Sequence, residues 1–176
     1  CVLPRYKVSA YHPGIMREYT EQLGLALGVR GLMNVQFALK DEVVCVLEVN
    51  PRASRTVPYA SKATNLNLAY VAAQVMAGKT LHELGVTEDP EVRHVAVKAS
   101  VFPFERFPGS DIILGPEMRS TGEVMGIDRR LGPALAKAMI AAGLSLPTSG
   151  TVFISVRDSD KPQVPEVARR LRNLGF

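Results

Sequence analysis

Cysteine, aromatic residues and long apolar runs are all scarce in this sequence. Cys1 and Cys45 are the only cysteines among 176 residues, so neither a disulfide framework nor a zinc site is indicated, and a reducing, cytoplasmic setting is favoured. No apolar run approaches the roughly 18 to 20 residues that cross a bilayer. Aromatic residues make up 6% of the chain and no basic stripe interleaves with them, which argues against a nucleic-acid-binding protein.

The remaining composition is that of an ordinary globular protein. Hydrophobic residues make up 47% and charged residues 22% of the chain, and its length suffices for one domain or one and a half. The net charge of +4 is mild, and it suits small anionic ligands such as phosphates better than nucleic acid. Because the chain starts at Cys1 and not at Met, we expect it to begin inside a longer polypeptide.

The segment from residue 31 to 56 carries the most specific pattern in the chain. It predicts two strands that alternate with period two and meet at a tight turn. The apolar faces of the two strands are expected to hold Met33, Val35, Phe37 and Leu39 in the first and Val43, Cys45, Leu47 and Val49 in the second. If Lys40 pairs with Val44 across a three-residue loop, Gln36 falls opposite Glu48.

Three oxygen donors and one guanidinium would then converge on this strand pair. Gln36, Glu48 and Asn50 share the polar face, and Arg52 follows just past the strand end. Mg²⁺ and Mn²⁺ favour carboxylate and amide oxygens, while a guanidinium grips phosphate bidentately. The alternative is an ordinary hairpin with polar residues on a wet face. Glu48 argues against it, since a carboxylate that interrupts the apolar run 43–47 needs a partner or a metal to offset its desolvation.

The rest of the chain alternates between predicted helices and strands. Helices are expected over 15–27, 65–78, 80–85 and 131–142, and strands over 91–104 and 122–127. The composition of residues 143–150 predicts a domain boundary, so we divide the chain into 1–146 and 147–176. Beyond the boundary, 151–156 is typical of a buried parallel strand, and an amphipathic helix follows it.

Three segments of the chain resemble one known family. Glu48-Val-Asn-Pro-Arg52, with Ser61-Lys-Ala-Thr64 after it, resembles the ATP-grasp fold and, more narrowly, the large subunit of carbamoyl phosphate synthetase. Gly115-Pro-Glu-Met-Arg-Ser-Thr-Gly-Glu-Val-Met-Gly126 and Ser155-Val-Arg-Asp-Ser-Asp-Lys161 resemble two further parts of that subunit, in the same order. The resemblance implies an α+β fold: the C-terminal lobe of an ATP-grasp fold, followed by the first βα unit of an α/β, methylglyoxal-synthase-like regulatory domain.

The resemblance also implies roles for individual residues. It assigns Gln36, Glu48 and Asn50 to the Mg²⁺ or Mn²⁺ ions that bridge the phosphates of ATP, which is the substrate. It places Arg52 at the transferred phosphoryl group and adds Arg55 as a second catalytic residue.

For several other polar residues, the sequence leaves two interpretations open. Ser155 and Lys161 are candidates for binding a nucleotide effector, against the alternative of an ordinary helix start. Lys62 either steadies an anionic intermediate or caps a helix end. Arg119 and Glu123 are expected to form an internal ion pair rather than to act in catalysis.

The activity implied by the resemblance is the ATP-dependent phosphorylation of carbamate to carbamoyl phosphate, for pyrimidine and arginine biosynthesis. The expected partners are a glutaminase small subunit and the rest of the large subunit. The glycine-rich lobe that covers ATP is absent from the chain, so we expect the isolated fragment to be inactive. Two alternatives are another ATP-grasp ligase, such as a biotin-dependent carboxylase, and a non-catalytic regulatory module with a vestigial metal site.

One departure from the family pattern generates a prediction. Members of the family that respond to ornithine carry a glutamate directly after the lysine equivalent to Lys98, and here that residue is Ala99. Because the carboxylate that would bind an ammonium group is missing, we expect ornithine to leave the rate of the intact enzyme unchanged. Steady-state rates with and without ornithine check this, and stimulation by ornithine would contradict it.

Overall fold

The computed structural model describes residues 1–6, 9, 11–102 and 122–176, which form two compact units, Cys1–Ala142 and Gly143–Phe176. Each unit is described by itself. The predicted pair between Arg119 and Glu123 lies outside this range, because Arg119 is not among the described residues. None of the described helices is long and apolar enough to cross a membrane.

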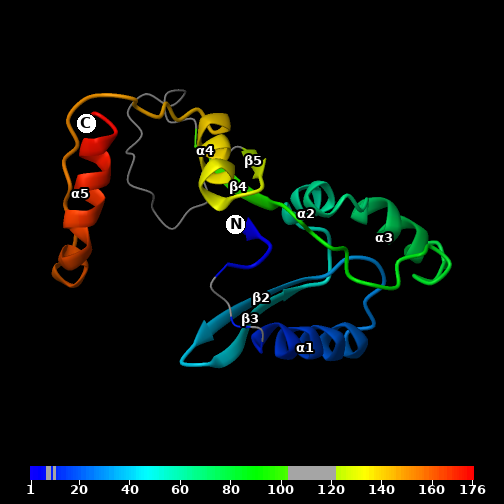
Figure 1. Ribbon diagram of the computed structural model, residues 1–176. Helices are drawn as coiled ribbons and strands as arrows, with labels where there is room; N and C mark the ends of the chain where they lie inside the picture. Colours follow the sequence, from blue (N-terminus) through cyan, green and yellow to red (C-terminus); the bar gives the residue numbers. More distant parts are fainter. Residues whose placement is uncertain (7–8, 10, 103–121) are drawn as a thin grey trace, which may run out of the picture. The chain divides into compact units, whose positions relative to one another are not determined.

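A three-stranded antiparallel sheet organises the first unit (Figure 1). Its strands are β1 (Val2–Leu3), β4 (Val95–Val101) and β5 (Gly122–Asp128), in the order β1-β4-β5. Helix α4 (Leu131–Ala141) packs on one face of β4 and β5. Helix α2 (Thr56–Thr64) packs on the other. The strand expected over 122–127 and the helix expected over 131–142 are confirmed within a residue, and the strand expected over 91–104 is shorter.

The two faces of this sheet are packed differently. On the α4 side, Val97, Ala134 and Ala138 form one buried cluster. On the α2 side, the buried residues are Tyr59, Ala63 and Ala96, and the Tyr59 hydroxyl donates a hydrogen bond of 2.8 Å to the Ala96 carbonyl. Successive residues of β4 therefore serve opposite helices, as the period of two in a strand requires.

Helix α4 approaches β5 closely because small residues face each other there. A Cβ placed on Gly126 would lie 2.5 Å from the Ala138 nitrogen and within overlap of the Ala134 carbonyl oxygen. Ala134 and Ala138 are themselves fully buried. Glycine at position 126 is thus a packing requirement of the helix–sheet contact, not a requirement of backbone conformation.

The predicted strand pair is a separate hairpin of β2 (Asn34–Lys40) and β3 (Val43–Asn50). Lys40 pairs with Val43, so the three-residue loop that we expected is wrong. The connection has two residues, Asp41 and Glu42, whose φ angles of 48° and 64° fit the tight hairpin turns in which both central residues are left-handed.

A bulge in β3 restores the pairing of the polar residues. Gln36 pairs with Glu48 and Phe37 with Val46, so Leu47 is the extra residue. The bulge moves Val44 and Val46 to the face of Phe37, and it moves Cys45 to the face of Gln36. The face that we expected for the second strand is therefore wrong beyond the bulge, and Cys45 is exposed rather than buried.

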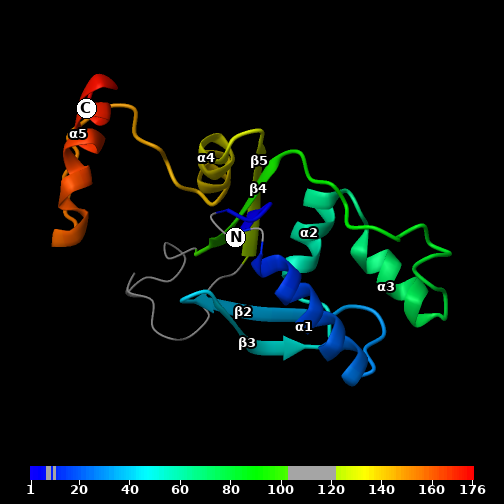
Figure 2. The same ribbon diagram turned by 60° about the horizontal axis from the view of Figure 1, so that its bottom comes forward.

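Helix α1 (His12–Ala26) runs along the apolar face of the hairpin in both views (Figures 1 and 2). Tyr19 and Leu23 of α1 line a shallow hollow together with Val46. At the start of the helix, His12 is buried, its Nδ1 lies 2.7 Å from the Ser9 hydroxyl, and its Nε2 lies 3.0 Å from the Glu42 carboxylate in the hairpin turn. Because α1 lies on the apolar face, this helix leaves the polar face of the hairpin uncovered.

The helix expected over 65–78 is shorter in the structure, where it is α3 and is preceded by a separate helix, α2. Helix α2 ends at Thr64 and is followed by Asn65, which takes a left-handed conformation with φ 56°. Helix α3 (Leu68–Met76) begins after Asn67, whose side chain accepts a hydrogen bond of 3.0 Å from the Tyr70 nitrogen. Helix α2 was not expected. Residues 80–85 form turns and no helix, although Thr80 and Glu83 make the reciprocal bonds of a capping box.

The second unit contains a short 3-10 helix, η2 (Asp158–Gln163), and α5 (Val164–Asn173). The amphipathic helix was expected, but residues 151–156 are not a strand. An extended segment needs a neighbouring strand to satisfy its backbone groups, and the described part of this unit holds none.

Replacing Gly126 by Ala tests the close helix–sheet contact. The added methyl group would force α4 away from β5, so we expect a loss of about 1 to 3 kcal/mol in the free energy of unfolding. Gly132→Ala is the matched control, because a Cβ there meets nothing within 4 Å and alanine favours a helix. Urea unfolding of both variants gives the comparison, and equal stabilities would contradict the packing described.

Candidate functional site

The polar face of the hairpin carries four oxygen-bearing side chains in two cross-strand pairs. Gln36 lies directly opposite Glu48, as predicted, and Asn34 lies directly opposite Asn50. Because directly opposed residues in an antiparallel pair have Cβ atoms about 4.5 to 5.5 Å apart, one carboxylate and three amide groups gather within one small patch.

Asn34 is the member of this patch that the sequence reasoning did not select. The period of two places it on the face of Gln36, and the expected pairing of Gln36 with Glu48 already implies that Asn34 lies opposite Asn50, because antiparallel partners advance in opposite directions. The structure has this pairing, on the side of the bulge away from the turn.

Arg52 folds back onto the end of this patch. Its backbone nitrogen donates to the Asn50 carbonyl at 2.8 Å, and its guanidinium lies 3.4 Å from the Asn50 side-chain oxygen. A second guanidinium nitrogen donates to the Ala53 carbonyl at 3.0 Å. The structure therefore brings together Gln36, Glu48, Asn50 and Arg52, the four residues predicted for the metal and the phosphoryl group.

The physical argument that singled out Glu48 is corrected. Glu48 and Gln36 are exposed, so the carboxylate is hydrated and needs no partner to offset desolvation. Among the described residues, no group of three or more His, Cys, Asp or Glu is arranged to hold a metal ion. The donor set at the hairpin is of a different kind, with one carboxylate and amide oxygens, which fits a weakly held Mg²⁺ or Mn²⁺ that also binds phosphate.

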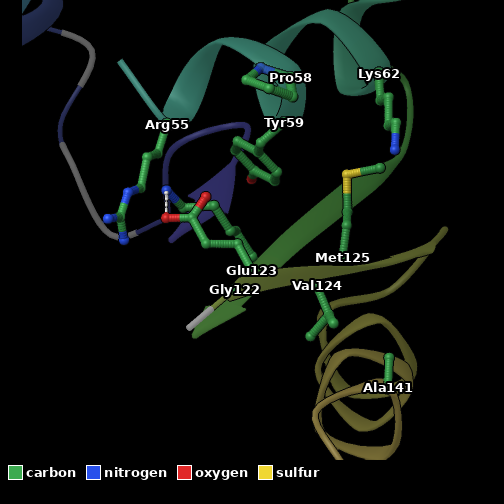
Figure 3. A pocket seen from close by; sticks show the side chains of 10 residues that line it. Arg55, Pro58, Tyr59, Lys62, Gly122, Glu123, Val124, Met125 and Ala141 are labelled. Atoms are coloured by element: carbon green, nitrogen blue, oxygen red, sulfur yellow. Dashed lines mark hydrogen bonds and ion pairs between the residues drawn. The ribbon is translucent and has the colours of Figure 1, made fainter. Parts of the chain in front are cut away.

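A second group of charged side chains lies between α2 and the sheet (Figure 3). Arg55, Tyr59 and Lys62 project from one side of α2 at spacings of four and three residues, toward the strand that carries Glu123. Together with Lys98 of β4 they line a depression of about 750 Å³. Arg55 thus lines the depression beside α2, whereas Arg52, three residues earlier, contacts Asn50 at the end of the hairpin patch.

Lys98 and Glu123 form the central ion pair of this depression. The Lys98 ammonium lies 3.0 Å from a Glu123 oxygen, 3.4 Å from the Thr56 hydroxyl and 5.9 Å from the centre of the Tyr59 ring. Burial raises the pKa of Tyr59 above its ordinary value, with a smaller opposing effect of a hydrogen bond at Leu3. Tyr59 therefore stays a neutral hydrogen-bond donor at physiological pH.

The sequence did not identify Lys62 or Lys98 as residues of this depression. Lys62 had two interpretations, and it both lines the depression and lies in the last turn of α2. Lys98 was noted only for the residue that follows it. The signal for Lys98 is its charge inside a strand with no other charged residue, on the face opposite to Val97 and Ala99.

In the second unit, Ser155 and Lys161 are both exposed, and Lys161 is a member of η2. The Lys161 ammonium lies 2.6 Å from an Asp158 oxygen, and the Arg157 guanidinium lies 2.9 Å from an Asp160 oxygen. Both cations are thus paired with carboxylates of the same short turn. No contact joins Ser155 to Lys161 among the hydrogen bonds of the described residues.

Comparison with solved structures finds a related fold. A chain described as a single-chain, multi-domain long-chain acyl-CoA carboxylase superposes with a TM-score of 0.50 and 25% sequence identity. The match covers 57% of this chain and 12% of that chain. A carboxylase is thus a distant structural relative.

Comparison with characterised sequences gives much closer relatives. Residues 4–84 match the family model of the ATP-binding domain of the carbamoyl-phosphate synthase L chain. The carbamoyl phosphate synthase large chain of Myxococcus xanthus is 58% identical over 99% of this chain, and that of Pseudomonas syringae is 57% identical over all of it. The large chain of Archaeoglobus fulgidus is 55% identical, also over the whole chain.

The chain spans 16% of the length of each of these relatives. Its whole length is matched, and both the hairpin residues and the second unit lie within the aligned part. The chain therefore belongs to the family of carbamoyl phosphate synthase large chains, and it represents one part of such a large chain.

Proposed function

We propose that this chain is the C-terminal lobe of the ATP-grasp unit that phosphorylates carbamate with ATP, followed by the start of a regulatory domain. The observation that carries the proposal is the pairing of Gln36 with Glu48 and of Asn34 with Asn50 on one open face, with Arg52 at its end. The family model that matches this part of the chain is described as ATP-binding. The enzyme class that fits is an ATP-dependent ligase.

The hairpin residues suit phosphoryl transfer because that reaction is catalysed by positioning and by neutralising charge on phosphate oxygens. Gln36, Glu48 and Asn50 would hold the Mg²⁺ or Mn²⁺ that supplies this neutralisation when bound. Arg52 is held at the same edge by its bond to Asn50, so its remaining guanidinium donors can meet an anionic oxygen there. Arg55, which directly precedes α2, would act on the substrate.

The proposal requires further parts of the parent protein. A lobe that covers the adenine and the triphosphate has to come from the rest of the large chain, and ammonia has to come from a glutaminase small subunit. Carbamoyl phosphate formed in this way would feed pyrimidine and arginine biosynthesis. The isolated chain would hold metal ligands but no adenine pocket, so we propose that it is inactive alone.

For the second unit we propose that residues 147–176 are the start of a methylglyoxal-synthase-like regulatory domain. Ser155 and Lys161 would contact the phosphate of a nucleotide effector at the start of η2. The pair between Lys161 and Asp158 would have to open for this contact, which is feasible because both side chains are well exposed and such pairs are weak.

The rival functions fit less well. A carboxylase is related to the chain at 25% identity, whereas three large chains of carbamoyl phosphate synthase exceed 50% over its whole length. A vestigial metal site would leave the donor residues free to change, yet Gln36, Glu48, Asn50 and Arg52 stand in one arrangement that suits phosphate chemistry.

Glu48→Ala in the full-length large chain tests the catalytic assignment. Loss of the one carboxylate in the patch removes the charge that holds the metal, so we expect carbamoyl-phosphate-dependent formation of ATP from ADP to fall by about 100-fold or more. Glu88→Ala removes an exposed carboxylate outside the hairpin and is the control. Normal ATP formation by Glu48→Ala would exclude this site.

Metal binding by the 176-residue chain is measured separately. Electron paramagnetic resonance of Mn²⁺, with and without ATP, compares the unchanged chain with Glu48→Ala. We expect binding that the variant loses. If neither protein binds Mn²⁺, the hairpin alone is not a metal site, and only assembly with the other lobe can make it one.

Lys161→Ala in the full-length large chain tests the regulatory assignment. We expect the response of the rate to nucleotide effectors to be lost while the rate without effector is unchanged, because Lys161 lies outside the hairpin. Lys79→Ala, which removes an exposed lysine of the first unit, is the control. An unchanged nucleotide response in Lys161→Ala would remove Lys161 from the effector site.

A further inference from the structure

The ion pair between Lys98 and Glu123 is unusually enclosed for this chain. The Lys98 side chain is 11% exposed and that of Glu123 is 23% exposed, whereas every other described lysine or arginine pair has at least one partner more than half exposed. Surface pairs contribute little to stability. An enclosed pair keeps one geometry, because leaving either charge unpaired in this place is costly.

The pair joins three elements that are distant in the sequence. Lys98 belongs to β4 and Glu123 to β5, where Glu123 pairs with Ser100 and so lies diagonal to Lys98 on the same face. The third contact, from the Lys98 ammonium to the Thr56 hydroxyl at 3.4 Å, reaches the first residue of α2. Lys98 is therefore the polar link between the sheet and the start of that helix.

The start of α2 is an unfavourable place for a cation. The N-terminus of a helix carries a partial positive charge, and Arg55 adds a full positive charge directly before Thr56. An ammonium placed beside them is repelled unless a carboxylate compensates it. Among the described residues that line this depression, Glu123 is the one carboxylate, beside the three cations Arg55, Lys62 and Lys98.

We propose that Lys98, held by Glu123, is a positioning residue that fixes the first turn of α2 and thereby the direction of Arg55. The start of α2 is capped locally by the bond from the Thr56 nitrogen to the Ser54 hydroxyl at 3.2 Å, and the helix is anchored to the sheet one turn further on, where the Tyr59 hydroxyl bonds to Ala96. The link from Lys98 to Thr56 ties the first turn itself to the sheet. This inference rests on the proposed function, because it concerns the alignment of Arg55 with the phosphoryl group.

Lys98→Met in the full-length large chain removes the ammonium and retains most of the stem. A misplacement of about 1 Å costs up to about 100-fold in rate, so we expect kcat for carbamoyl-phosphate-dependent ATP formation to fall about 10- to 100-fold, with KM for ADP unchanged. Lys98→Arg keeps a donor and a charge and should recover most of the rate.

Lys137→Met is the matched control. Lys137 also pairs with a carboxylate, Asp128, at 2.8 Å, and its side chain lies on the α4 side of the sheet and does not contact α2. A general loss of an ion pair would affect both variants alike. We expect Lys137→Met to retain the normal kcat, and a loss equal to that of Lys98→Met would overturn the proposal.

A second measurement needs no turnover. In the 176-residue chain with ¹⁵N-labelled arginine, the Nε–H signal of Arg55 should shift in Lys98→Met and in Glu123→Gln, and should stay in place in Lys137→Met. An Arg55 signal that stays in place in Lys98→Met would overturn the proposal. If Glu48→Ala leaves ATP formation normal, the proposed function fails instead, while the Arg55 shift still reports on positioning.

Discussion

The register of the β2–β3 hairpin is the constraint on which the candidate site depends. Side chains in a strand alternate between faces, so a slip of one residue would send Glu48 to the side covered by α1. Two irregularities set the register together: a two-residue turn that shortens the connection, and a bulge at Leu47 that adds one residue to β3. Their effects cancel between Gln36 and Glu48, and for this reason the polar residues meet.

This cancellation explains which part of the site could be predicted from sequence. The pairing of Gln36 with Glu48 was predicted correctly although the predicted loop was wrong. A three-residue loop without a bulge and a two-residue loop with a bulge give the same pairing at these two residues. The two solutions differ between the bulge and the turn, where Cys45 was placed on the wrong face. Periodicity alone cannot locate a bulge, since the residues 43–47 are almost uniformly apolar.

The depression beside α2 could not be predicted for another reason. Helix α2 is short, and its start carries a capping bond from the Thr56 nitrogen to the Ser54 hydroxyl at 3.2 Å but no acidic residue in the first turn, so its start signal is weak. The meeting of Lys98 with Thr56 spans 42 residues, and that of Lys98 with Glu123 spans 25. Contacts over such distances follow from the packing of helices on the sheet. Where local signals were strong, as at Asn67 and at Thr80 with Glu83, the hydrogen bonds agree with the sequence.

Strand β4 has a further consequence for how this protein can vary. Its odd-numbered residues, such as Val97 and Ala99, pack against α4, where Gly126, Ala134 and Ala138 leave no spare volume. Its even-numbered residues, Ala96 and Lys98, face α2 and the charged depression. Tolerance to substitution should therefore differ between positions of a single strand: size limits Val97 and Ala99 toward α4 and Ala96 toward α2, whereas charge decides what position 98 accepts. Chemistry on the α2 side can then diverge between relatives without repacking the α4 side.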